Sequence, residues 1–266
     1  MWKKDEKKPI AQYLTLTFLI AWISEGILIL GEQLGLLTDN TVSTVMTFAI
    51  IGLGAGMAPT YAIYILLKKH GQIRGFKDFC GRIFKTENVL YTIIITAVFC
   101  GSLIIMNIIG NDYTGGWYLA ILSIPIMIVG GGLEELGWRS LQPALEEKMP
   151  FVAAAFSLGV IWAVWHLPLW LIQGANQSDM SIPAFFLYCI TMSFVLAALY
   201  KLTKNIFVCV ILHAFGNALG NIFTLDILIN TPDIINITVC AVMIIASTII
   251  WTAVDKREKS LLQEAK

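Results

Sequence analysis

The stretch WYLAILSIPIMIVGGGLEELGWR, residues 117–139, begins as an apolar segment and ends with two adjacent glutamates and an arginine. Its apolar part, residues 117–129, carries no charged side chain and is typical of the interior of a membrane helix. Burying one unpaired charge in a bilayer costs roughly 2.5–3.5 kcal/mol even on the mildest insertion scale. The charged residues that follow therefore indicate a functional group inside a membrane protein.

The composition of the whole chain also indicates a membrane protein. Of its 266 residues, 57% are hydrophobic and 14% are charged, whereas soluble domains carry about 25% charged residues. The net charge is zero and the basic residues are confined to connecting segments, which leaves no basic surface for nucleic acid. We therefore expect membrane lipid as a partner and no nucleic acid.

Apolar windows long enough to cross about 30 Å of hydrocarbon recur along the chain. They predict an all-α, polytopic membrane protein with about eight transmembrane helices that enclose a polar intramembrane cavity, in a single domain of residues 1–266. We interpret the first window as an uncleaved span, because its apolar run is longer than that of a signal peptide. The windows are 10–31, 43–67, 89–109, 117–142, 151–172, 182–200, 205–226 and 234–254.

Lysine and arginine are unevenly distributed over the loops. With eight spans, both termini and the loops after the second, fourth and sixth spans lie on one side. These segments hold all 18 Lys and Arg when Arg139, at the end of the fourth window, is counted with the loop that follows it. Because cytoplasmic loops carry the excess of basic residues, we expect both termini in the cytoplasm. The basic loop 68–85 also contains regularly placed phenylalanines, which suit an interfacial helix or a solvated connector.

Two histidines lie within predicted membrane helices, where ionisable side chains are costly and usually functional. His166 shares a helix face with Trp162, and His213 shares one with Asn217, because each pair is four residues apart. Counting along the helices from the connecting turns places Glu134 and His166 about 21–24 Å deep and His213 about 14 Å deep. These polar groups can therefore share one cavity.

Spacing separates the adjacent glutamates. Glu135 and Arg139 are four residues apart and can form an ion pair on one helix face. Glu134 points about 100° away, towards a partly dry cavity that disfavours the ionised carboxylate and so suits a general base. In the first span, Glu32 lies near the outer end and Glu25 has no motif around it. Both are candidates to line the cavity, and we assign them no catalytic role.

Structural alternatives exist for the same residues. The Glu–Arg pair suits a structural role or a transport path, and the asparagine in GNALG, residues 216–220, suits helix packing. Residues 130–132 are glycines, which allow another helix or a substrate to approach closely.

A carboxyl group and two imidazoles, without a serine or cysteine nucleophile motif, suit the activation of water. The HExxH zinc signature and paired intramembrane aspartates are absent. In one mechanism, Glu134 and His166 deprotonate water while His213 and Asn217 stabilise the oxyanion. In the other, His166, His213 and Glu134 hold a divalent metal such as zinc, which leaves one position for water.

The ordered motifs resemble those of the CAAX-prenyl protease and bacteriocin-processing (CPBP, or Abi) membrane proteases. EELGWR (134–139) matches that family's EExxxR motif and HAFGN (213–217) its HxxxN/H motif. WAVWH (162–166) resembles the FxxxH motif, with Trp162 in place of phenylalanine. The likeness covers about residues 90–225. The tryptophan keeps an aromatic ring on the same face, so we expect it to change the shape of the pocket rather than its chemistry.

The resemblance implies a role for each motif residue. Glu134 is the general base, His166 is its catalytic partner, and His213 with Asn217 forms the oxyanion hole. The remaining positions, which we expect to support this site, are Glu135, Arg139 and Trp162.

The resemblance also implies an intramembrane endopeptidase in the plasma membrane of a prokaryote. Its substrates range from prenylated CAAX proteins to bacteriocins and other peptides, and a cavity open to lipid and cytoplasm would suit such hydrophobic or lipidated segments. Members are commonly called metalloproteases, although a metal-free glutamate mechanism has been proposed for them. The rival hypotheses are a non-catalytic immunity factor and a proton-coupled transporter.

Overall fold

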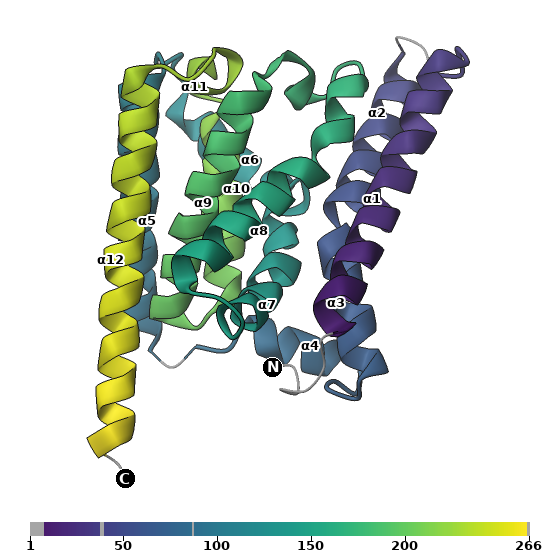
Figure 1. Cartoon of the computed structure of the whole chain (residues 1–266). Helices are drawn as coiled ribbons and strands as arrows, with labels where there is room; N and C mark the ends of the chain where they lie inside the picture. The colour runs from purple at the N-terminus through teal and green to yellow at the C-terminus, as the bar shows by residue number, and fades with distance from the viewer. Residues whose placement is uncertain (1–7, 38–39, 87, 265–266) are drawn as a thin grey trace.

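The computed structural model describes residues 8–37, 40–86 and 88–264, and no β-strand forms among them. The expected all-α class is therefore confirmed (Figure 1). The elements are α1 (Lys8–Gln33), α2 (Thr41–Ala49), η1 (Ile50–Gly56), α3 (Ala58–Lys69), α4 (Phe76–Ile83), α5 (Val89–Gly110), α6 (Trp117–Val129), η2 (Gly132–Glu134), α7 (Glu135–Glu146), α8 (Phe151–Trp165), η3 (Leu167–Leu171), η4 (Asn176–Asp179), α9 (Ile182–Thr203), α10 (Ile206–Leu219), α11 (Asp226–Ile229) and α12 (Ile234–Glu264).

The helices confirm an integral membrane protein but not the expected number of spans. Within the described residues, α6 and the η2–α7 segment form a bent pair that would make a seventh span, and α10 has only 14 residues. At 1.5 Å per residue α10 is about 21 Å long, which is too short to cross about 30 Å of hydrocarbon. The count of about eight is therefore not confirmed. The six helical segments that are long and apolar enough by themselves are Ile10–Gln33, Thr41–Lys69, Val89–Ile109, Phe151–Leu171, Ile182–Thr203 and Ile234–Glu264.

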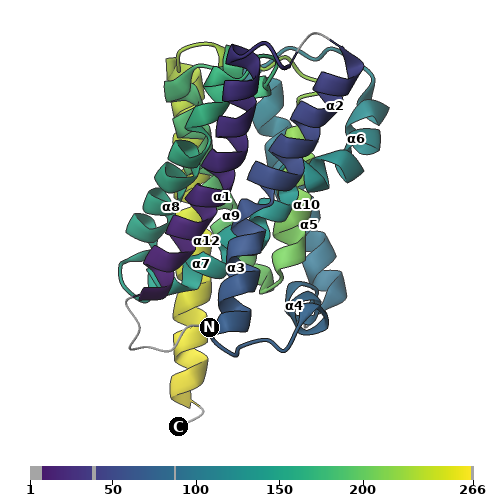
Figure 2. The same cartoon turned by 90° about the vertical axis from the view of Figure 1, so that its right-hand side faces the viewer.

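The basic segments gather at one end of the bundle. The start of α1, the helix α4 and the end of α12 lie at this end, and the α1–α2 connection lies at the other (Figures 1 and 2). The basic residues among 1–7, which contribute to the expected orientation, lie outside the described residues. The placement of this end in the cytoplasm stays a prediction.

The break between α6 and α7 gives Glu134 its position. The chain bends by 42° between these helices, at Gly130 and Gly131. The carbonyl of Leu133 accepts a hydrogen bond of 2.6 Å from the Thr60 hydroxyl on α3. Backbone that leaves regular helical bonding in a membrane needs such a partner. Gly132 then allows η2 to lie directly against α10, since a Cβ there would be 2.7 Å from the Val210 carbonyl oxygen.

The sharp turn between α9 and α10 sets how far His213 and Asn217 lie from the end of the bundle. Lys204 has a left-handed backbone conformation, with φ of 52°, and ends α9. The side chain of Asn205 then accepts a hydrogen bond from the Val208 amide and caps α10. Because α10 begins at once, His213 and Asn217 lie in the interior half of the bundle.

Gly159 allows the backbones of α8 and α9 to lie in close contact, and a substitution at this position tests that contact. A Cβ at this position would lie 2.5 Å from the Ile190 Cα, and backbone atoms cannot move aside as a flexible side chain can. We expect Gly159→Ala to lower the thermal midpoint in detergent, because such overpacking costs about 1–3 kcal/mol. Gly101→Ala on α5 is the matched control, since a Cβ there meets no atom within 4 Å. An unchanged midpoint in Gly159→Ala would contradict this close packing.

The orientation can be tested by single added cysteines in intact cells. Lys256 on α12 and Asp179 on η4 are exposed. The C-terminal end of α12 and the segment that contains η4 lie at opposite ends of the bundle (Figure 1). A membrane-impermeant maleimide is expected to label Asp179→Cys in intact cells and Lys256→Cys only after lysis. The unmodified chain, with its own cysteines, gives the background. The reverse labelling pattern would overturn the orientation.

Candidate active site

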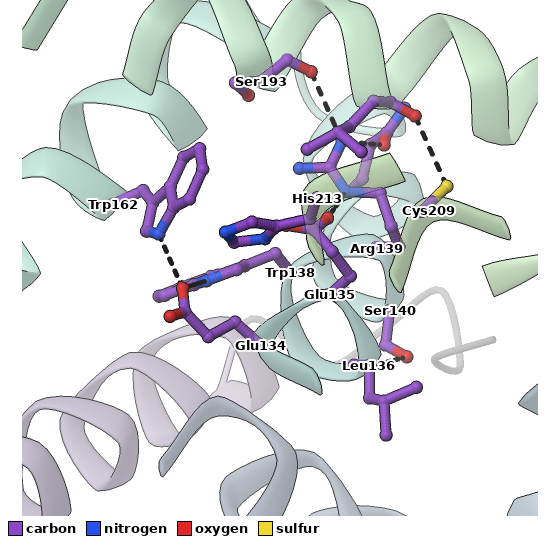
Figure 3. Close-up of polar contacts among 12 residues, drawn as sticks. Glu134, Glu135, Leu136, Trp138, Arg139, Ser140, Trp162, Ser193, Cys209 and His213 are labelled. Carbon is purple, nitrogen blue, oxygen red and sulfur yellow. Dashed lines mark hydrogen bonds and ion pairs between the residues drawn. The ribbon is translucent and has the colours of Figure 1, made fainter. Parts of the chain in front are cut away.

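Three motif segments that are far apart in the sequence meet around η2. Glu134 ends η2, His166 follows the last residue of α8, and His213 and Asn217 lie on α10. The element α10 packs against η2, α6 and α7, and α8 packs against α7. Figure 3 shows the side chains of Glu134, Trp162 and His213 close together.

Two tryptophans hold the carboxyl group of Glu134. Its Oε2 accepts a hydrogen bond of 2.8 Å from Trp162 Nε1 and a longer one of 3.4 Å from Trp138 Nε1. Among the described residues, no hydrogen-bond donor to Oε1 is found, and the side chain is only 4% exposed. One oxygen is thus fixed by indole N–H groups and the other is left for a substrate or water.

From the sequence, Trp162 was expected only to change the shape of the pocket. The structure gives it a polar contact as well. Phenylalanine, which the family motif has at this position, could not donate the hydrogen bond to Glu134. The ring also lies 5.1 Å from the His213 ring and 5.9 Å from the His166 ring, between centroids. Sequence reasoning missed Trp138, although its spacing of four residues from Glu134 was a usable signal.

The ring of His166 is fixed at the end of α8. Its Nδ1 lies 2.9 Å from the carbonyl oxygen of Trp162, and because a carbonyl only accepts, Nδ1 carries the proton and donates. The rings of Trp165 and Phe185 enclose it, at centroid distances of 4.6 and 5.1 Å. Nε2 of the neutral ring therefore has its lone pair available within the cavity.

Glu135 and Arg139 form the ion pair that their spacing predicted. Glu135 Oε2 lies 2.8 Å from Arg139 Nε, and both side chains are almost fully buried. The other carboxylate oxygen, Oε1, lies 3.1 Å from His213 Nδ1. Arg139 also donates to Gln142 Oε1 at 2.8 Å and to the Ser193 carbonyl at 3.4 Å. This network fixes the orientation of the His213 ring (Figure 3).

Gly131 borders the polar atoms of His213 and Asn217. A Cβ at Gly131 would lie 3.1 Å from His213 Nε2 and 2.4 Å from Asn217 Nδ2. Both nitrogens therefore lie close to the backbone of the break. The absence of a side chain at this glycine makes room for the side chains of His213 and Asn217.

A cavity of about 360 Å³ gives access to Glu134 and His166. It runs between α1, α2, η1, α6 and the η3–η4 segment, and His213 and Asn217 are not among its lining residues. At its side it reaches Phe48 and Ile126, which are exposed on the surface of the bundle. An opening to lipid was expected and agrees with these positions.

This cavity opens at the end of the bundle opposite to the basic segments. The polar lining residues at the rim, including Gln173 and Asn176, lie at the end where α1 meets the η3–η4 segment. That end is opposite to α4 and to the end of α12 (Figure 1). Helix α7, which follows Glu134 directly and is mostly buried, lies towards the basic end (Figure 1).

The residues proposed as metal ligands do not form a metal-binding group here. Among the described residues, no three or more His, Cys, Asp or Glu side chains converge in an arrangement that could hold a metal ion. His213 uses Nδ1 for Glu135, and the Oε2 of Glu134 is held by indoles. The set His166, His213 and Glu134 does not fit a metal centre in this arrangement.

The fold and the site together describe a polytopic membrane protein with a buried carboxyl group and two imidazoles close together. The sequence model of the family described as Type II CAAX prenyl endopeptidase Rce1-like matches residues 116–219. CAAX prenyl protease 2 of Methanococcus maripaludis is 25% identical over 192 residues, which cover 64% of this chain and 71% of that protein. These two similarities support the resemblance to the CPBP family that the three motifs predicted, and they indicate a peptidase.

Gly131 offers a test of the space next to His213 and Asn217. We expect Gly131→Ala to reduce peptidase kcat/KM by about 10²-fold or more, the effect of losing one oxyanion donor, because the new methyl group displaces Asn217. Gly101→Ala adds the same methyl group in open space on α5 and should leave the rate unchanged. Equal activity of the two variants would show that this space takes no part in the reaction.

Proposed function

We propose that the protein is an intramembrane endopeptidase that depends on Glu134 and cleaves a hydrophobic or lipidated peptide with activated water. The observation that carries this proposal is the carboxyl group of Glu134, held at one oxygen by Trp162 and bordering the same cavity as His166. The family match supports an endopeptidase at the level of class. Dependence on Glu134 and the mechanism are our proposal.

In the proposed reaction, a water molecule lies between Glu134 and the free Nε2 of His166. Glu134 takes a proton from this water while the water oxygen attacks the peptide carbonyl carbon. The C–N bond then breaks, and the proton passes from Glu134 to the leaving amine. No step is routed through a metal, because the candidate ligands do not form a metal-binding group among the described residues.

The negative charge on the carbonyl oxygen needs preorganised donors. Asn217 Nδ2 and His213 Nε2 both lie next to Gly131, which precedes Glu134 in the break between α6 and α7. When His213 carries a proton on each nitrogen, Nδ1–H donates to Glu135 and Nε2–H is directed to the oxyanion. The buried Glu135 carboxylate favours that protonated ring. These donors are fixed before substrate binds, so little reorganisation is needed.

The openings of the cavity support a substrate that is partly membrane-embedded. A lipid chain or apolar side chains can enter between α2 and α6, beside the exposed Phe48 and Ile126. The relative from Methanococcus maripaludis is named a CAAX prenyl protease, and prenylated peptides are therefore one substrate class for this chain. Processing of bacteriocins, and a location in a prokaryotic plasma membrane, remain proposals from the resemblance.

Purified protein in nanodiscs, with quenched fluorescent hydrophobic peptides, tests the proposed function. We expect Glu134→Gln and His166→Ala to lower kcat/KM by about 10²–10⁴-fold, the usual contribution of an acid–base group. Glu147→Gln, an exposed glutamate just after α7, is the matched control and should retain the activity. Thermal midpoints establish that each variant is folded.

Wild-type cleavage rates in both folded site variants would contradict the proposal. A proton flux that depends on Glu134, without cleavage of any peptide, would favour the rival transporter instead. Binding without cleavage or flux would favour the non-catalytic immunity factor.

A further inference from the structure

Glu25 on α1 is a buried carboxyl group that the proposed reaction does not use. Its side chain is 1% exposed, and its Oε2 has no hydrogen-bond partner among the described residues. It nevertheless lines the cavity that also borders Glu134 and His166. A buried polar group without a partner is unfavourable, so a cation that reaches this carboxyl group from the cavity would stabilise it.

Packing of α1 does not account for a carboxyl group at this position. Ala21 and Leu28, one turn to either side on the same helix face, are apolar and fully or almost fully buried. An apolar side chain could continue this face at lower cost than an unpaired carboxyl group. The function of Glu25 therefore lies in what it contacts inside the cavity.

The charges that line the cavity are of one sign. Glu32 lies two turns further along α1, about 10.5 Å from Glu25 along the axis. Glu32 borders the same cavity near the polar rim of that cavity. There, Glu32 Oε2 accepts a hydrogen bond of 3.2 Å from the backbone amide of Gln173. With Glu134, three carboxyl groups line the cavity, and none of its described lining residues is lysine or arginine. A cation entering from the rim is favoured, and a free carboxylate finds no basic partner.

We propose, on the basis of the proposed function, that Glu25 is a specificity residue that binds a cationic group of the peptide substrate. The group is an ammonium or guanidinium, supplied either by a lysine or arginine side chain or by the α-amine of the peptide. Such cations form the charge-assisted hydrogen bonds that a carboxylate accepts best. The substrate class is then a hydrophobic or lipidated segment with one positive charge near the bond that is cleaved.

A set of matched peptides tests this inference on the wild-type protein. The parent is a neutral hydrophobic peptide with an acetylated N-terminus and an amidated C-terminus, and lysine or glutamine is placed at each position in turn. A further peptide has a free α-amine, which separates the two sources of the cation. We expect at least one of these cationic peptides to have a kcat/KM about tenfold above its neutral partner, mainly through a lower KM.

The variant Glu25→Gln is expected to reduce the ratio of kcat/KM between the cationic peptide and its neutral partner to about one, whatever the absolute rate of the variant. Glu25→Asp, which keeps the charge on a shorter side chain, should retain a reduced preference and serves if the glutamine variant does not fold. Glu147→Gln should keep the wild-type ratio. Cleavage of every peptide by the wild type without any preference for a cation would overturn the inference and leave the proposed function standing.

Binding measurements separate the two proposals. Fluorescence anisotropy of the labelled lysine and glutamine peptides on Glu134→Gln protein reports affinity without turnover. Tighter binding of the lysine peptide, lost in the Glu25→Gln/Glu134→Gln double variant, supports recognition by Glu25 even if the wild type cleaves nothing and the proposed function fails. Equal affinity of the two peptides for Glu134→Gln contradicts it.

Discussion

The hydrogen bond from the Trp162 indole to the Glu134 carboxyl group is the contact on which the site depends. It joins α8 to the break between α6 and α7, two parts of the chain that are 28 residues apart in sequence. The same indole contacts the rings of His166 and His213. A single side chain therefore sets the position of the carboxyl group relative to both imidazoles. A donor that cannot ionise is well suited to this task, because it adds no charge to the membrane interior.

Charge inside the bundle is compensated unequally, and the difference separates the roles of the glutamates. Glu135 has Arg139 on one oxygen and His213 on the other, so its charge is paired on both sides. Removing either partner would leave an uncompensated buried charge, which is strongly destabilising. Glu134 has only indole donors, and Glu25 has an oxygen without any partner among the described residues. The paired group is structural, while the two incompletely satisfied groups face the cavity, where a substrate can complete them.

Glycines let the backbone itself form part of the site. Gly132 brings η2 against α10, and Gly131 leaves space beside His213 and Asn217. The hydroxyl of Thr60 on α3 donates a hydrogen bond to the carbonyl of Leu133 and so ties this break to a neighbouring helix. As a result, Glu134 lies at the start of α7 rather than in the middle of a continuous helix, with a cavity on one side and the closely packed α10 on the other.

The sequence by itself determined the all-α membrane class, the resemblance to the CPBP proteases and the ion pair of Glu135 with Arg139. These follow from local rules: lipid penalises unpaired charge, and residues four apart share a helix face. Only the tertiary structure decided the short α10, the second indole from Trp138 and the end at which the cavity opens. It also gave Glu25, an isolated glutamate in the sequence, a place in the wall of the cavity. Each of these depends on which helices are neighbours, and that choice is made by contacts between distant segments, which no local pattern records.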